Sequence, residues 1–152
     1  MKTFAKQYLL PAVILFLSSC SNDAVYKNIR QLSYGTSFGE CIGFCTHQVA
    51  LKTNKATFTC YSYYPTQQTL TSTDSIKGSA VDSIYSLDTT AFFNLPETIG
   101  CPDCADGGAE WLEVELTNGT KHKVTFEYQH EPASLKNQIL KLREVLHKNE
   151  CK

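Results

Sequence analysis

Residues 112–128 read LEVELTNGTKHKVTFEY, in which apolar and polar residues alternate on both sides of an Asn-Gly pair. Alternation with a period of two is typical of strands that bury one face, so the sequence predicts an antiparallel hairpin. A two-residue Asn118-Gly119 turn would place Leu112 opposite Thr125 and direct one apolar set outward. We therefore expect a three-residue loop over 117–119, with Gly119 in the left-handed conformation.

This register matches the two strands on both faces. The inward pairs are Leu112 with Val124 and Val114 with His122, and the outward pairs are Glu113 with Lys123 and Glu115 with Lys121. Opposite charges that face each other across two strands are each modestly stabilising. The pattern thus favours this register over the shorter turn.

A second hairpin is predicted earlier in the chain, from residues 47–53 and 56–63, after a weaker strand over 29–34. A two-residue turn at Asn54-Lys55 pairs Val49 with Cys60 and Leu51 with Phe58, which places all four side chains on one face. Cys60 is therefore expected to point into the core, where a buried free thiol is one interpretation.

Two helices are predicted from apolar residues at helical spacing, over 74–87 and 132–148. Their stripes are Ile76, Ala80, Ile84 and Leu87 in the first, and Leu135, Ile139, Leu142 and Leu146 in the second. The polar residues 65–73 are expected to form a loop, and Phe92, Phe93 and Leu95 a short turn that anchors the core. Hairpins and helices in series predict a two-layer α+β fold, an antiparallel sheet built from hairpins with two helices on one face.

The first 20 residues are typical of an export signal. Lys2 and Lys6 precede an apolar run over 8–17, which is too short to span a bilayer as a mature helix. The run ends in Leu17-Ser-Ser-Cys20, which resembles the lipobox of bacterial lipoproteins, in which the cysteine receives the lipid. We expect a lipoprotein signal peptide over 1–19, the lipidated Cys20 with a tether over 20–27, and a single α+β domain over 28–152. The alternative is an ordinary secretory signal that contains a chance cysteine.

The lipobox resemblance implies that acyl chains hold the protein to a membrane of the bacterial cell envelope. In enterobacterial lipoproteins an Asp after the lipidated cysteine favours the inner membrane, so Ser21 indicates the outer membrane, on either face. The formal net charge of the chain is −1, which argues against binding to nucleic acid. The partner that remains, besides the membrane, is an unidentified envelope protein or ligand.

Six cysteines follow Cys20, namely Cys41, Cys45, Cys60, Cys101, Cys104 and Cys151. An even number in an exported chain indicates disulfides, and the two close clusters are each expected to close on themselves, with Cys60 and Cys151 free or paired. Four thiolates from Cys41, Cys45, Cys101 and Cys104 could instead hold zinc. A third interpretation makes Cys101 and Cys104 a catalytic dithiol, although the nearby carboxylates would raise the thiol pKa values.

The chain offers no set of residues in a catalytic pattern, and we expect neither enzymatic activity nor a cofactor. The histidines His47, His122, His130 and His147 are not at ligand spacing, and each is expected to be structural or solvated. The densest unusual stretch is residues 100–111, in which Asp103, Asp106, Glu110 and Trp111 form a candidate functional loop. Its three carboxylates could bind a hard cation such as calcium, or the stretch could be a disulfide-pinned loop that leads into a strand.

Several motifs together resemble bacterial exported proteins of the domain-of-unknown-function family number 6438. These are Gly39-Glu-Cys-Ile-Gly-Phe-Cys45 before a hairpin, Cys101-Pro-Asp-Cys104, and Val124-Thr-Phe-Glu127 before a closing helix. The resemblance covers residues 28–147, and it departs from the family at Thr46 and His47, where the family has proline and then an aromatic residue. Because the family has no established activity, it implies a fold and a location but no catalytic residue.

These observations predict a non-catalytic binding or structural module of the envelope. The alternative is a thiol redox or metal-handling protein that uses the Cys41/Cys45 and Cys101/Cys104 clusters. A chain of 152 residues, 42% of them hydrophobic, excludes a disordered tail and a multi-domain enzyme.

Overall fold

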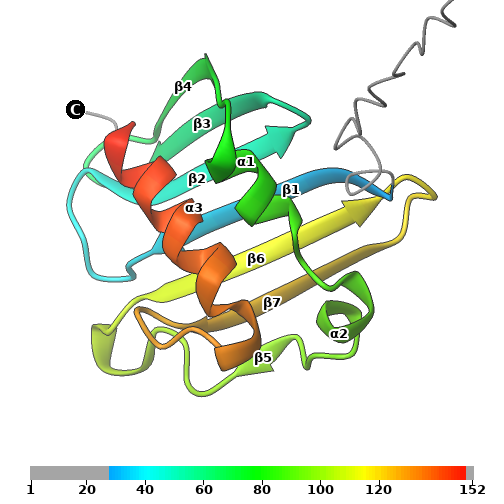
Figure 1. The fold of residues 1–152 in the computed structure, drawn as a ribbon. Coiled ribbons are helices and arrows are strands. Elements are labelled where there is room, and N and C mark those ends of the chain that lie inside the picture. The colour runs from blue at the N-terminus through cyan, green and yellow to red at the C-terminus, as the bar shows by residue number, and fades with distance from the viewer. Residues whose placement is uncertain (1–27, 150–152) are drawn as a thin grey trace, which may run out of the picture.

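The computed structural model describes residues 28–149, which form one seven-stranded sheet (Figure 1). The strand order is β4-β3-β2-β1-β6-β7-β5, and neighbouring strands are antiparallel except for β5, which runs parallel to β7. The strands are β1 (Ile29–Ser37), β2 (Phe44–Lys52), β3 (Lys55–Ser62), β4 (Gln68–Ser75), β5 (Thr98–Ile99), β6 (Ala109–Leu116) and β7 (Lys121–Glu127).

The helices pack on one face of this sheet and leave the other face open (Figure 1). The α-helices are α1 (Ser79–Tyr85), α2 (Thr89–Phe93) and α3 (Lys136–Lys148), and short 3-10 turns lie at Cys104–Asp106 and Ala133–Leu135. The helices α1 and α3 contact each other, and α3 also contacts β1 and β2. The predicted two-layer α+β architecture is therefore confirmed. No helix within residues 28–149 is long and apolar enough to cross a membrane.

The core lies between the sheet and α3. In β1, Leu32 and Tyr34 point to the helices, and their neighbours in β2 and β6 are apolar as well. The predicted stripe of the last helix is buried against this surface, at Leu135, Ile139, Leu142 and Leu146. Burying an aliphatic side chain contributes roughly 1.5–3 kcal/mol, so this stripe fixes α3 across the sheet.

The hairpin of β6 and β7 has the predicted register. Leu112 pairs with Val124 and Val114 pairs with His122. Gly119 has a φ of 88°, a left-handed conformation that glycine adopts without steric cost. On the open face the Lys121 ammonium lies 3.3 Å from a Glu115 carboxylate oxygen.

The hairpin of β2 and β3 has the predicted faces but a different turn. The turn is at Thr53-Asn54 rather than Asn54-Lys55, so Val49 pairs with Phe58 and not with Cys60. Thr53 supplies the required positive φ, 55°, and Lys55 already pairs with Lys52. A slip of two residues keeps every side chain on its face, which is why the predicted buried residues are still buried.

The prediction of a loop over 65–73 followed by a helix from residue 74 is wrong. Residues Gln68–Ser75 form β4, which pairs with β3 along its whole length, and α1 begins only at Ser79. All eight residues of β4 are exposed, because it is an edge strand with no helix above it. Its threonines favour a strand. Because the segment is almost entirely polar, it lacks the alternation of apolar and polar residues that identifies a strand in a sequence.

Two other segments are more regular than predicted. The first strand continues from Ile29 to Ser37 rather than ending at residue 34, and the expected turn around Phe92 and Phe93 is the short helix α2. The Asp88 carboxylate caps α2 by accepting a hydrogen bond from the Ala91 amide at 3.0 Å. Phe92 then packs edge-on against the His122 ring of β7, at 5.3 Å between centroids.

Candidate functional site: a cleft beneath α3

Each of the two close cysteine clusters forms a disulfide within itself, as predicted. One disulfide joins Cys41 and Cys45 in the connection between β1 and β2, and the other joins Cys101 and Cys104 between β5 and β6. In this structure the four sulfurs are therefore oxidised, and they do not offer the thiolates that zinc requires.

Cys60 is buried on the helix-facing side of β3, as predicted, but it is not a free thiol. Its sulfur is disulfide-bonded and lies 3.7 Å from Nδ1 of His47. Cys151 lies outside the described residues, as do the predicted signal peptide, Cys20 and the tether.

The two disulfide-bearing loops meet at the same end of the sheet (Figure 1). The Gly39 amide donates a hydrogen bond to the Asp103 carboxylate at 3.4 Å. Gly108 lies directly against the Phe38 ring, so that a Cβ at this position would collide with the ring. The second loop thus supports Phe38, which follows β1 and whose amide donates to the Cys45 carbonyl at 3.1 Å.

The structure does not bring the four residues of the candidate loop together. Asp103 and Asp106 are exposed in the disulfide loop, whereas Glu110 is fully buried under α3. Trp111 is on the opposite face of the sheet, where the Lys123 ammonium lies 4.6 Å from the ring centroid. Consecutive residues of a strand point to opposite faces, which separates Glu110 from Trp111. No group of three or more His, Cys, Asp or Glu side chains within residues 28–149 is placed to hold a metal ion.

Glu110 instead forms a buried ion pair with α3. Arg143 donates two hydrogen bonds to the Glu110 carboxylate, from Nε at 3.1 Å and from Nη2 at 2.9 Å. Nη2 also donates to Glu131 at 2.8 Å, so one guanidinium joins two carboxylates. Bidentate pairs of this kind are among the stronger hydrogen bonds in proteins.

These contacts shift the pKa values of Arg143 and Glu131, the two half-buried members of the triad. Burial would lower the pKa of Arg143, but its hydrogen bonds to Glu110 and Glu131 raise it above the usual range. Partial burial would raise the pKa of Glu131, but the hydrogen bond from Arg143 outweighs it and the pKa is lowered. Arg143 and Glu131 are therefore both ionised at neutral pH.

Sequence reasoning missed this triad because Glu110 and Arg143 are 33 residues apart. One signal was present. Glu110 has the same strand phase as the apolar Leu112 and Val114, and a carboxylate at an inward position requires a buried partner.

Tyr34 lies beside the triad, in the centre of the sheet. Its side chain is fully buried, and its hydroxyl makes no hydrogen bond of standard geometry within residues 28–149, although Glu110 and Arg143 lie close enough to interact with it. Burial and the negative charge of Glu110 raise the pKa of Tyr34 well above its usual range, so the hydroxyl keeps its proton. A buried hydroxyl without a partner costs about 1–3 kcal/mol, and such groups need a physical explanation.

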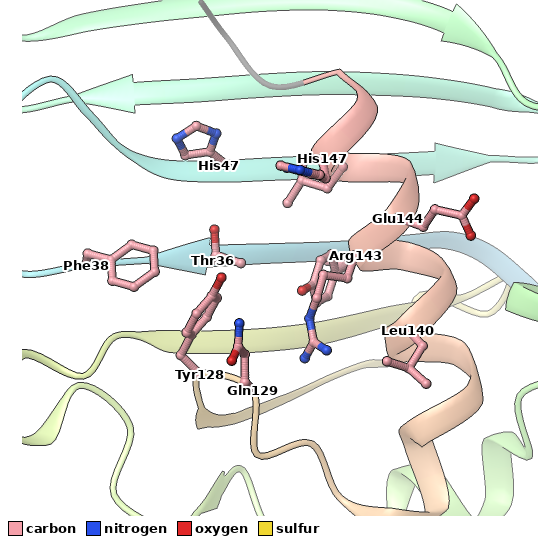
Figure 2. Close-up of a pocket in the computed structure, with 11 residues that line it drawn as sticks. Thr36, Phe38, His47, Tyr128, Gln129, Leu140, Arg143, Glu144 and His147 are labelled. Atoms are coloured by element: carbon pink, nitrogen blue, oxygen red, sulfur yellow. The ribbon is translucent and has the colours of Figure 1, made fainter.

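A cleft of about 510 Å³ opens next to Tyr34, between α3 and the ends of β1 and β2 (Figure 2). Its polar surface includes Tyr34, Thr36 and Gln129, and its apolar wall includes Phe38, Tyr128 and Leu140. The Phe38 and Tyr128 rings pack edge to face at 4.9 Å. Both disulfide loops contact Phe38, which forms this wall. The disulfides therefore brace this side of the cleft.

Three of the four histidines have hydrogen bonds to backbone carbonyls, which agrees with the predicted structural role. His47 lines the cleft and donates from Nε2 to the Phe44 carbonyl at 2.7 Å. His122 donates from Nε2 to the Leu95 carbonyl at 2.9 Å. His130 donates from Nδ1 to the Tyr128 carbonyl at 3.0 Å, and it lines a small pocket together with the disulfide-bonded Cys101 and Cys104.

No protein-family model and no curated protein matches this chain. The resemblance to family number 6438, which rests on the two cysteine motifs and the last strand, therefore stays a prediction.

Proposed function

We propose that the protein is a non-catalytic binding module, anchored by lipid in the bacterial envelope, and that the cleft beneath α3 is its ligand site. The observation that carries the proposal is the Tyr34 hydroxyl, which is buried at the cleft without a hydrogen bond of standard geometry. A polar group of a bound ligand would complete the hydrogen bonding of the Tyr34 hydroxyl.

The dimensions and stiffness of the cleft support this proposal. Small-molecule sites are largely preformed clefts of about 300–1,000 Å³, mainly apolar with a few placed polar groups. The cleft, at about 510 Å³, has this composition. Its two sides are held independently, because the Glu110–Arg143 ion pair fixes α3 and the disulfide loops fix Phe38. A site that is rigid before binding loses less entropy when the ligand arrives.

A fragment screen by ligand-observed NMR tests the cleft. The protein would be residues 20–152 with Cys20→Ser, and the collection would hold neutral, acidic and basic fragments in equal numbers. We expect hits that disappear in Leu140→Trp, because Leu140 lines the cleft and is 44% exposed on α3, so a larger side chain there fits the helix but fills the opening.

The matched control is Asn137→Trp, at an exposed position on the same helix that does not line the cleft. It should keep every hit. The proposal fails if no fragment binds, or if both tryptophan variants retain the same hits.

The lipid anchor is tested separately, by growth with an alkyne analogue of palmitate in a bacterial host. The lipobox over 17–20 predicts that the chain takes up the label and fractionates with the outer membrane. Cys20→Ala should abolish both. An unlabelled chain in the soluble periplasmic fraction would instead indicate an ordinary secretory signal.

The alternative function is thiol redox or metal handling through the two cysteine pairs. The exposure of Cys101 and Cys104 favours it, since an accessible disulfide can be attacked by a thiol. Against it, the Cys101 amide donates to the Glu127 carboxylate at 2.7 Å, and no α-helix begins at this pair to stabilise a thiolate. Insulin-reduction activity that is lost in Cys101→Ser would establish the alternative.

A further inference from the structure

We propose that the ligand of the cleft is uncharged and rich in hydroxyl groups, with one apolar face, which is the chemistry of a short neutral glycan. This inference rests on the proposed function of the cleft and adds the class of ligand.

The Lys, Arg, Asp and Glu charges at the cleft are already compensated. Arg143 and Glu144 are the lining residues, among those described, that carry a Lys, Arg, Asp or Glu charge. Arg143 is bound to two carboxylates, at 2.9 and 2.8 Å. The lining also includes His47 and His147. A charged ligand would lose its hydration in the cleft and gain no unpaired Lys, Arg, Asp or Glu side chain among the described lining residues in return.

Glu144 does not change this balance. Its carboxylate contacts Lys148 at 2.7 Å and Lys141 at 3.2 Å on the exposed side of α3. Figure 2 shows the Glu144 side chain directed away from Thr36 and Tyr128, on the far side of the helix. A cationic ligand in the cleft therefore finds no unpaired carboxylate there among the described side chains.

Three polar side chains at the cleft are neutral donors and acceptors. The Tyr34 hydroxyl is protonated and buried, Thr36 adds an aliphatic hydroxyl, and Gln129 adds an amide that both donates and accepts. In Figure 2 the Thr36 and Gln129 side chains lie on the same side of the cleft as Tyr128. Such groups match ligand hydroxyls, which also donate and accept.

The apolar wall of the cleft is aromatic and partly exposed. Phe38 and Tyr128 present half-buried rings, and Leu140 lies opposite them on α3 with 44% of its surface exposed. A sugar ring has a C–H face that packs on aromatic rings and a rim of hydroxyls, so one molecule satisfies the wall and the polar groups together.

Isothermal titration with three disaccharides of similar size tests the class. The probes are N,N′-diacetylchitobiose, which is neutral, its deacetylated cationic form, and the acidic hyaluronan disaccharide. We expect the neutral probe to bind and each charged probe to bind at least about tenfold more weakly, the difference that one unfavourable charge of about 1.4 kcal/mol makes.

Tyr34→Phe is the decisive variant. Loss of one hydrogen bond of about 1 kcal/mol should weaken binding of the neutral disaccharide about fivefold. The same change should leave the free protein about as stable as before, because it removes a buried hydroxyl that makes no hydrogen bond of standard geometry. Gln129→Gly, at a position with φ 62° that glycine tolerates, should also weaken binding, whereas Asn137→Ala on α3 should not.

The inference is overturned if the charged probes bind as well as the neutral one, if Tyr34→Phe leaves the affinity unchanged, or if Tyr34→Phe clearly destabilises the free protein. If fragments bind in the cleft but the neutral disaccharide does not, the glycan class fails and the binding function stands. If fragments do not bind either, both fail.

Discussion

Glu110 is the residue whose replacement should affect stability most specifically. Its side chain is 0% exposed, and Arg143, 25% exposed, is its hydrogen-bond partner. We expect Glu110→Gln to destabilise the protein by about 2–3 kcal/mol. The Arg143 guanidinium would lose the buried one of its two carboxylate partners. Urea denaturation measures the change.

A double variant separates the ion pair from mere packing. Replacing both partners, as Glu110→Met with Arg143→Met, should recover part of the loss, since it leaves no charge buried alone. The exposed pair Glu144–Lys148 is the control, and Glu144→Ala should leave stability nearly unchanged. Equal losses at Glu110 and Glu144 would contradict the buried pair.

Glu131 gives a pH dependence with a definite sign. Its folded-state pKa lies below the ordinary value of 4.5, because the hydrogen bond from Arg143 outweighs the opposing effect of burial. The unfolded chain therefore binds the proton first, so the stabilisation from Glu131 is complete above pH 4.5 and is lost as the pH falls through the folded pKa.

The measurement is urea denaturation of the wild type and Glu131→Gln at several pH values. The wild type should be the more stable of the two at neutral pH, and the difference should shrink below pH 4.5. A difference that stays constant down to the lowest pH would show that Glu131 does not contribute through its charge.

At the scale of elements, the loop between β6 and β7 depends on Gly119. At a φ of 88° an alanine is strained, so Gly119→Ala should cost about 1 kcal/mol. Gly43 is a control with nearly the same φ, 91°, in a loop outside the hairpin. If the hairpin forms early in folding, Gly119→Ala should slow refolding in stopped-flow measurements and Gly43→Ala should mainly speed unfolding. Equal effects on both rates would argue against early formation of the hairpin.

The same elements show what the sequence can and cannot predict. The register of β6 and β7 was predictable, because Leu112 and Val124 belong to alternating patterns that only one pairing can bury together. The strand β4 was not, because an exposed edge strand has no apolar alternation. The cleft could not be predicted from the sequence, because it depends on contacts such as that of Phe38 with Gly108, which only the folded chain makes.

At the scale of the whole molecule, the disulfides and the core have separate roles. The bonds Cys41–Cys45 and Cys101–Cys104 span only 4 and 3 residues, so each restricts the unfolded chain little, and their removal should cost about 2 kcal/mol each. The core between the sheet and α3 does not include these loops, so a variant with all four replaced by serine should stay folded.

This four-serine variant should nevertheless lose fragment binding, because the loops that support Phe38 are released. Circular dichroism checks the fold, and the fragment screen checks the cleft. A folded variant that binds fragments as tightly as the wild type would show that the disulfides do not brace the site.

The position of bound fragments on the protein is the most direct test of whether the cleft is the ligand site. Chemical shifts of the ¹⁵N-labelled chain would be followed as the fragment hits are added. We expect the largest shifts at the amides of Thr36, Phe38 and Gln129, around the cleft. Shifts centred on Trp111, on the open face of the sheet, would place binding on the opposite side of the molecule and contradict the cleft as the functional site.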